Sequence, residues 1–358
     1  MTPFARPEEL DVAILREMYR DRRVGLTGID PRLNASRVAR SLGIGRNRVA
    51  GRLRGWRTSG FLRRYAVWLH PGLLGWVGGF LNLRVGHPRG KPGLLEQLAL
   101  VDGVLSAVVL LGGWVSVTVI APDRPSLQRR WELLRRLTGV VEAEPLDVWN
   151  VPLARTSLTP LELRIVRALR AAPEATIHDI ARAVGISTRT MTRKYSALLD
   201  DGSVWFVPLF DFSAFPFPVV MVSASFRPDG DPARWAEAVR ARYPLAVGGS
   251  TSFLEPRSST ESALLYVLLP SPAQLEDLER TAEAVPGVDQ IDLSVLVRVV
   301  DFPEWYDRHL AQLAGAGPVR GRAEARDPVR PADRSAPDAN GTARPRSRRT
   351  GRAAPPHG

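Results

Sequence analysis

Arginine dominates the side chains that could do chemistry in the N-terminal part of this 358-residue chain. The stretch 35–65 holds nine arginines and no acidic residue, a net charge of +9. A guanidinium group can bind guanine through two hydrogen bonds or pair with phosphate, and an asparagine amide can read adenine. A run of charge is usually a solvated face, but a bias this one-sided predicts double-stranded DNA as the partner.

Hydrophobic spacing places these arginines on a helix that follows a turn. Val38, Ala39 and Leu42 indicate a short helix, Gly43 a turn, and a third helix follows with the apolar residues Ile44, Val49, Leu53 and Trp56. Two short amphipathic helices around a turn glycine are typical of a helix-turn-helix unit. The candidate DNA contacts are the residues expected to face outward from the third helix: Arg46, Asn47, Arg48, Arg52, Arg54 and Arg57.

The helix-turn-helix pattern occurs twice in the chain. Residues 38–44 align with residues 180–186, and the offset of 142 persists without a gap to Gly60 and Gly202. Upstream the offset is 151, so the first copy carries nine extra residues, placed in a loop around 22–34. The second copy has a net charge of only +1 over 177–207, and its candidate DNA contacts are Thr188, Arg189, Thr190, Thr192 and Arg193. We therefore expect the first unit to supply most of the phosphate affinity.

Each helix-turn-helix pattern is followed by strand and helix patterns in the order βαββαβ, which is typical of a ferredoxin-like domain. In the first copy the expected strands are 76–85, 104–111, 114–120 and 140–149, with helices at 92–101 and 126–137. The second copy has strands at 219–226 and 288–300, and Asp231-Pro232 and Ser271-Pro272 begin its two helices. The predicted fold class is α+β, with domain bounds at 1–66, 67–155, 156–210, 211–314 and 315–358.

Composition limits the class of protein further. The segment 315–358 carries a net charge of +6 and almost no large apolar residue, which predicts a disordered basic tail. The chain has no cysteine, so disulfides and thiolate metal sites are excluded and a cytoplasmic location is expected. The uncharged stretch 103–121 approaches the length of a membrane span, but Gly112-Gly113 favours a β-hairpin and no membrane.

The chain resembles the Lrp/AsnC (feast/famine) family of transcriptional regulators in a tandem fused form. The resemblance covers about residues 10–300 and rests on GFLRRY at 60–65, LHPGLLG at 69–75, and the paired motifs VDGV at 101–104 and VPGV at 285–288. It implies ferredoxin-like domains that pair through their sheets, an intramolecular pseudo-dimer and a homo-oligomer.

The same resemblance implies an amino-acid-like small-molecule effector bound between the ferredoxin-like domains. The corresponding candidate ligand-binding residues are Leu111, Gly112, Gly113, Trp114, Gly248, Gly249 and Ser250. The acidic residue that the family has in this hairpin, a natural partner for an ammonium group, is missing from both copies. The glycines equally suit a tight hairpin without any ligand.

Two other functions stay open. Fused proteins of similar length include siroheme-decarboxylase-like enzymes of the same fold, which the resemblance implies use His, Tyr and Arg in the sheet region. Here the strands 105–111 and 245–248 offer no acid, base or cation, and the five histidines lack metal-ligand spacing. We therefore expect a regulator, not an enzyme, with no catalytic residue, metal or cofactor. A helix-turn-helix module that binds protein is the third possibility, and the nine-arginine stretch argues against it.

Overall fold

The computed structural model describes residues 7–20, 35–149, 157–243, 246–250, 254–255, 262–269, 271–315 and 319–320. All of them belong to one compact unit, Met1–Ala323, and the second unit, Glu324–Gly358, lies outside the described residues, as does the predicted loop insertion at 22–34. Within the predicted tail, Val319–Arg320 form the short strand β13, which pairs with β6 (Ser157–Leu158). Together with Gly315, the last residue of α11 (Pro303–Gly315), these two residues extend the described structure past the predicted start of the tail at residue 315.

Both helix-turn-helix units consist of three helices, as predicted. The first contains α1 (Pro7–Arg20), α2 (Ala35–Ser41) and α3 (Arg46–Thr58), and the second contains α6 (Pro160–Ala171), α7 (Ile177–Val184) and α8 (Thr188–Asp200). The turn glycines Gly43 and Gly185 have φ values of +64° and +75°, a conformation that other residues rarely adopt. The predicted apolar faces of the third helices are buried, among them Val49, Trp56 and Met191.

Two βαββαβ units follow the helix-turn-helix units, which confirms the α+β fold. The first contains β2 (Val77–Val85), α4 (Lys91–Ala99), β3 (Val104–Leu110), β4 (Trp114–Ala121), α5 (Arg124–Arg135) and β5 (Val140–Trp149). The second contains β8 (Val219–Phe226), α9 (Pro232–Arg242), β9 (Ala246–Ser250), β11 (Ser262–Leu268), α10 (Leu275–Glu283) and β12 (Val288–Asp301).

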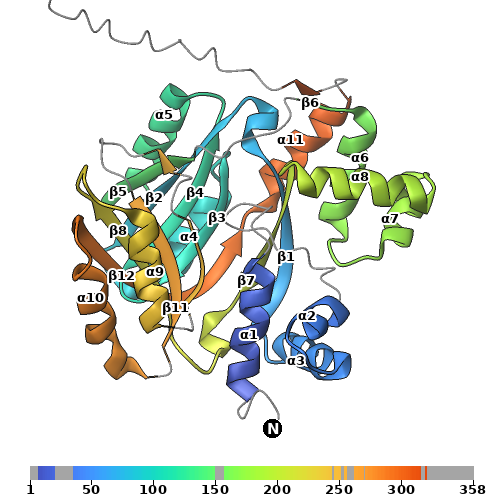
Figure 1. Ribbon diagram of the computed structural model, residues 1–358. Helices are drawn as coiled ribbons and strands as arrows, with labels where there is room; N and C mark the ends of the chain where they lie inside the picture. Colours follow the sequence, from blue (N-terminus) through green and yellow to red (C-terminus); the bar gives the residue numbers. More distant parts are fainter. Residues whose placement is uncertain are drawn as a thin grey trace, which may run out of the picture. The chain divides into compact units, whose positions relative to one another are not determined.

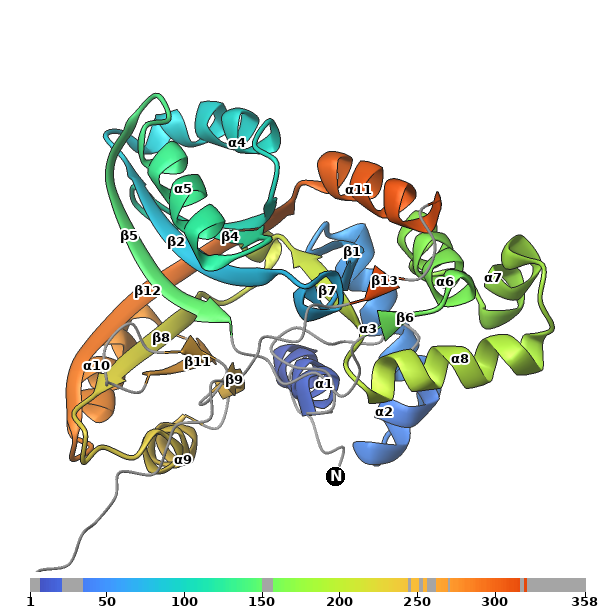
Figure 2. The same cartoon turned by 90° about the horizontal axis from the view of Figure 1, so that it is seen from above.

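The two units share one antiparallel sheet of nine described strands, in the order β10-β5-β2-β4-β3-β12-β8-β11-β9. They join where β3 pairs with β12, with Leu110 opposite Leu296 and Ser106 opposite Asp301. Short strand β10 (Leu254–Glu255) pairs with β5 at the far end of this order. Because Ser250 of β9 and Leu254 of β10 are four residues apart, the two ends of the sheet lie within about 14 Å of each other. The sheet is therefore rolled, with α4 and α5 covering one side and α9 and α10 the opposite side (Figures 1 and 2).

A second pair of strands, which directly follow the third helices in the chain, joins the two copies. β1 (Leu62–Leu69) pairs antiparallel with β7 (Val204–Phe210), and Ala66 lies opposite Val207. These strands follow α3 and α8 at equivalent positions of the repeat, so the ribbon relates the two copies by an approximate twofold axis. The sequence analysis did not predict this pairing, and β1 runs through the predicted boundary between residues 66 and 67.

Helix α11 (Pro303–Gly315) has no counterpart among the described residues of the first copy, and the sequence analysis did not predict it. It packs against α6 of the second helix-turn-helix unit, with Trp305, Tyr306 and Leu310 buried. The Trp305 Nε1 donates to the carbonyl oxygen of Val104 at 2.6 Å, and the Tyr306 hydroxyl exchanges hydrogen bonds with the backbone of Leu69 at 3.0 and 3.2 Å. The helix thus ties α6 to both β1 and the first βαββαβ unit.

We predict that Tyr306→Phe lowers the free energy of unfolding by about 1–2 kcal/mol, because the backbone N–H and C=O of Leu69 lose a buried partner. Chemical denaturation of the full chain measures this change. Tyr266→Phe is the matched control, since no hydrogen bond to its hydroxyl is present among the described residues, and its cost should be smaller. Equal costs for the two variants would show that Tyr306 contributes no more than packing.

Candidate nucleic-acid interface

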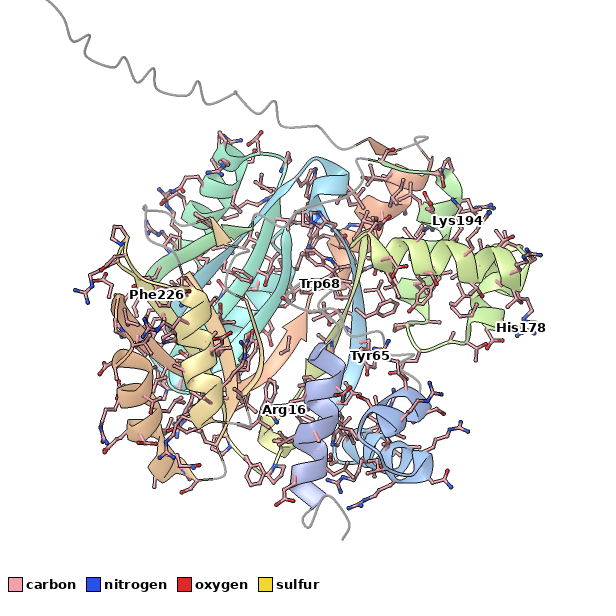
Figure 3. The ribbon with its side chains drawn as sticks, viewed as in Figure 1. Arg16, Tyr65, Trp68, His178, Lys194 and Phe226 are labelled. Carbon is pink, nitrogen blue, oxygen red and sulfur yellow. The ribbon has the colours of Figure 1, made fainter. Side chains whose placement is uncertain are left out.

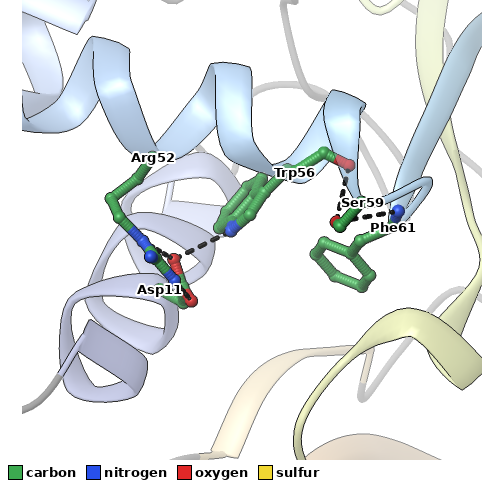
Figure 4. Close-up of polar contacts among 5 residues, drawn as sticks. All are labelled: Asp11, Arg52, Trp56, Ser59 and Phe61. Atoms are coloured by element: carbon green, nitrogen blue, oxygen red, sulfur yellow. Dashed lines mark hydrogen bonds and ion pairs between the residues drawn. The ribbon is translucent and has the colours of Figure 1, made fainter.

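A buried carboxylate holds the first helix-turn-helix unit together (Figure 4). Asp11 on α1 is 1% exposed, and it accepts hydrogen bonds from the Arg52 Nε at 2.7 Å and the Trp56 Nε1 at 2.8 Å. A second Arg52 nitrogen binds the other carboxylate oxygen, so the ion pair is bidentate. Arg52 was expected to face outward toward DNA. Its side chain is 36% exposed, but its guanidinium group is engaged in joining α3 to α1.

The second unit has the same ion pair at equivalent positions of the repeat. Glu162 on α6, 1% exposed, accepts a hydrogen bond from the Lys194 Nζ of α8 at 3.0 Å. Lys194 follows Arg52 by 142 residues and Glu162 follows Asp11 by 151, the two offsets of the repeat. Glu162 also closes a capping box with Thr159 at the start of α6. The cation at the seventh position of each third helix therefore has a structural role in both copies.

A third cation of α3 bridges the two helix-turn-helix units. Arg57, near the end of α3, pairs with Glu174 in the connection between α6 and α7, and both side chains are partly exposed. This ion pair corrects the expectation that Arg57 points freely outward. Of the other predicted contacts on α3, Arg46, Asn47 and Arg54 are exposed and Arg48 is half-buried.

The predicted contacts on α8 gather at its exposed N-terminal half. Ser187 caps the helix by accepting from the Thr190 backbone N–H at 3.2 Å, and Thr190 itself is half-buried. The other four predicted residues are exposed: Thr188, Arg189, Thr192 and Arg193. His178 on α7 lies 3.3 Å from the Thr188 hydroxyl, and Figure 3 shows His178 and Lys194 on this unit.

The start of α7 carries an acidic side chain whose pKa is shifted. A hydrogen bond from the Thr176 hydroxyl at 2.7 Å lowers the pKa of Asp179, and the neighbouring Arg182 adds to this shift. Asp179 therefore stays ionised, and its charge offsets that of Arg182. The exposed positive charge of α8 is that of Arg189 and Arg193.

The candidate ligand-binding hairpin of the first copy is built for a tight turn. Gly112 has a φ of +75°, and a Cβ on Gly113 would lie 3.0 Å from the carbonyl oxygen of Val85. Leu111 is exposed, and Trp114 is half-buried with the Arg84 guanidinium 5.9 Å from its ring centre. These contacts account for both glycines without a ligand.

The candidate ligand-binding residues of the second copy do not form a corresponding hairpin. Gly248, Gly249 and Ser250 belong to β9, which pairs with β11. The two sets of candidate residues thus occupy different kinds of structure. Within the described part of the chain, no group of three or more His, Asp or Glu side chains could hold a metal ion, and no helix is long and apolar enough to cross a membrane.

We predict that Asp11→Ala lowers the free energy of unfolding by about 3 kcal/mol, because the Arg52 charge and the Trp56 N–H lose their buried partner. Asp11→Asn, which keeps an acceptor for Trp56, should cost roughly half as much. Glu174→Ala is the control, since it breaks a partly exposed ion pair worth about 0.5 kcal/mol. Denaturation curves that rank Glu174→Ala level with Asp11→Ala would contradict this account.

Glycine inside α3 gives a second prediction. Gly51 and Gly55 lie within the helix, and a Cβ at either position would meet no atom within 4 Å. Gly51→Ala and Gly55→Ala should therefore each raise the free energy of unfolding by roughly 0.5–1 kcal/mol, the helix-propensity difference. Denaturation of both variants tests this, and a loss of stability would reveal a steric constraint on α3.

Comparison with known proteins supports a helix-turn-helix assignment for part of the chain. Residues 158–204 match a family model described as winged helix-turn-helix DNA-binding. No curated protein sequence matches the chain.

Among solved structures, the chain is similar to the siroheme decarboxylase NirDL, at 17% identity and a TM-score of 0.49, over 85% of this chain and 98% of that chain. It is also similar to E. coli AsnC, at 20% identity and a TM-score of 0.28, over 41% of this chain and 95% of that chain. A transcriptional regulator from Neisseria meningitidis in complex with L-Met matches at 17% identity and a TM-score of 0.29, over 38% of this chain and 88% of that chain. Each of these is a likeness of fold and assigns no function.

Proposed function

We propose that this protein binds double-stranded DNA through its two helix-turn-helix units and acts as a transcriptional regulator. The observation that carries the proposal is the pair of third helices, α3 and α8, each of which exposes cations on the side away from its buried core. Arg54 on α3 and Arg189 on α8 are exposed, as are the neighbouring polar residues Asn47 and Thr188. In the N-terminal part of such a helix, asparagine, threonine and arginine side chains suit base edges in the major groove. Arg54 lies in the C-terminal half of α3, where an arginine suits a flanking phosphate.

The internal ion pairs change how much positive charge each helix-turn-helix unit can offer to DNA phosphate. With Arg52 bound to Asp11 and Arg57 bound to Glu174, the surplus of outward positive charge on α3 is smaller than its composition indicates. The first unit still exposes Arg46 and Arg54 and has no acidic residue in α2 or α3, so we keep the proposal that it supplies more of the phosphate affinity. The proposal includes regulation by a small-molecule effector.

Binding to a duplex of random sequence, followed by fluorescence anisotropy over a range of salt concentrations, tests the proposal. Each phosphate contact adds about 0.9 to the slope of log affinity against log salt, so Arg54→Ala should weaken binding and reduce that slope by about one. Arg52→Ala, two residues away, is the matched control. It should lower the free energy of unfolding, and it should change the salt slope less than Arg54→Ala does. No binding by the folded wild-type chain at low salt would overturn the proposal.

A siroheme-decarboxylase-like enzyme is the second candidate, because NirDL, the protein whose structure spans 85% of this chain, is named for that activity. Such a reaction needs side chains that move protons and hold carboxylates. His70 accepts a hydrogen bond from the Gly72 N–H at 2.9 Å and His87 one from the Arg89 N–H at 3.1 Å, so one ring nitrogen of each is engaged with nearby backbone. Incubation with siroheme and mass spectrometry for loss of carbon dioxide separates the candidates: turnover without DNA binding favours the enzyme.

A further inference from the structure

The second helices of the two βαββαβ units, α5 and α10, occupy equivalent positions in the repeat but carry opposite charge. From Asp123 to Arg136, α5 and its two caps hold five arginines and two acidic residues, a net charge of +3. Helix α10 holds four acidic residues and one arginine, a net charge of −3. Helices that cover equivalent faces of duplicated domains have no packing reason to differ in this way.

On α5 the exposed charge forms a stripe around an apolar residue. Arg129, Leu133 and Arg136 are spaced i, i+4 and i+7, so they share one face of the helix, and all three are exposed. The Leu133 side chain is 50% exposed. Among the described residues, the large hydrophobic side chains that are at least half exposed all belong to this first unit: Leu100, Leu111, Leu133 and Val141. An apolar residue between two cations is a feature of contact surfaces more than of solvated faces.

On α10 the exposed acids have a matching spacing. Glu276, Glu279 and Glu283 are spaced i, i+3 and i+7, share one face, and are exposed. Both stripes therefore span seven residues, a length of about 10 Å along a helix. The remaining acid of α10, Asp277, is engaged with Arg242 at 2.9 Å and with the Tyr243 hydroxyl at 2.7 Å, which leaves the stripe to the three glutamates.

We propose that these stripes are the two halves of a self-association surface, in which α5 of one molecule packs along α10 of a second copy of this chain. Arg129 and Arg136 would face the glutamates, and Leu133 would be buried between the two helices. The proposal concerns the βαββαβ units and does not depend on the function proposed above.

The arrangement of the two helices determines the kind of assembly. α5 and α10 lie on opposite sides of the rolled sheet (Figures 1 and 2), so a molecule cannot satisfy its own stripes. A contact between two different surfaces is heterologous, and it continues from molecule to molecule until a ring closes. The expected behaviour is therefore growth beyond a dimer as concentration rises, weakened by salt because the charges are exposed.

Sedimentation velocity of the full chain without DNA, from about 1 to about 100 μM, tests the proposal. The weight-average mass of the wild type should rise with concentration. The double variant Arg129→Glu/Arg136→Glu should weaken association at least about tenfold, since like charges would then face each other. Adding Glu276→Arg and Glu283→Arg to that variant exchanges the signs of both stripes and should restore association. Arg234→Glu, an exposed reversal on α9, is the matched control and should change nothing.

Three results would overturn the proposal: a wild type that stays monomeric over this range, a reversed variant that associates like the wild type, or a four-site variant that fails to regain association. Circular dichroism of each variant establishes that it is folded before the comparison is made. If reversing α5 instead abolished duplex binding and left association intact, the α5 stripe would be a nucleic-acid contact and the proposal would fail.

Discussion

Backbone pairing between the two copies is the constraint on which this molecule depends. A strand at the edge of a sheet exposes unpaired N–H and C=O groups, and a βαββαβ unit alone has two such edges. Here β3 of the first copy pairs with β12 of the second, and β1 pairs with β7. The duplicated halves are therefore joined by main-chain hydrogen bonds at two levels, which fixes the two helix-turn-helix units on one framework in a single chain.

Charge in the helix-turn-helix units serves two purposes that composition does not separate. Arg52 and Lys194 stand at equivalent positions and bind buried carboxylates, so they stabilise the fold, whereas Arg54 and Arg193 are exposed. The same acid-to-base contact kept in both copies, with Asp and Arg in one and Glu and Lys in the other, indicates that the geometry of the pair matters more than the residue types. The informative contrast in this protein is thus between an exposed arginine and a nearby arginine that is bound to a buried carboxylate.

Periodicity and the internal repeat were sufficient to predict the two helix-turn-helix units and the βαββαβ order, because hydrophobic spacing and turn glycines are local signals. They could not predict β1 with β7, or β3 with β12, since the pairing partners lie far apart in the chain. Helix α11 was missed because the first copy, as far as the structure describes it, has no corresponding helix. The contact that Arg52 makes within the protein was missed because its partner lies on another helix. The sequence did contain a clue: in the alignment of the two copies, the acidic residues Asp11 and Glu162 occupy equivalent positions in the first helix of each unit.

The two copies are alike in fold and unlike in charge, both in their third helices and in α5 against α10. A duplicated chain that reads DNA with two different helices would contact two unequal half-sites on one face of the duplex, about one helical turn or a multiple apart. Hydroxyl-radical footprinting of the full chain on its bound DNA tests this central claim most directly. The account predicts two protected regions of unequal strength at that spacing. Absence of any protection, or a single uniform region that ignores the helical repeat, would contradict it.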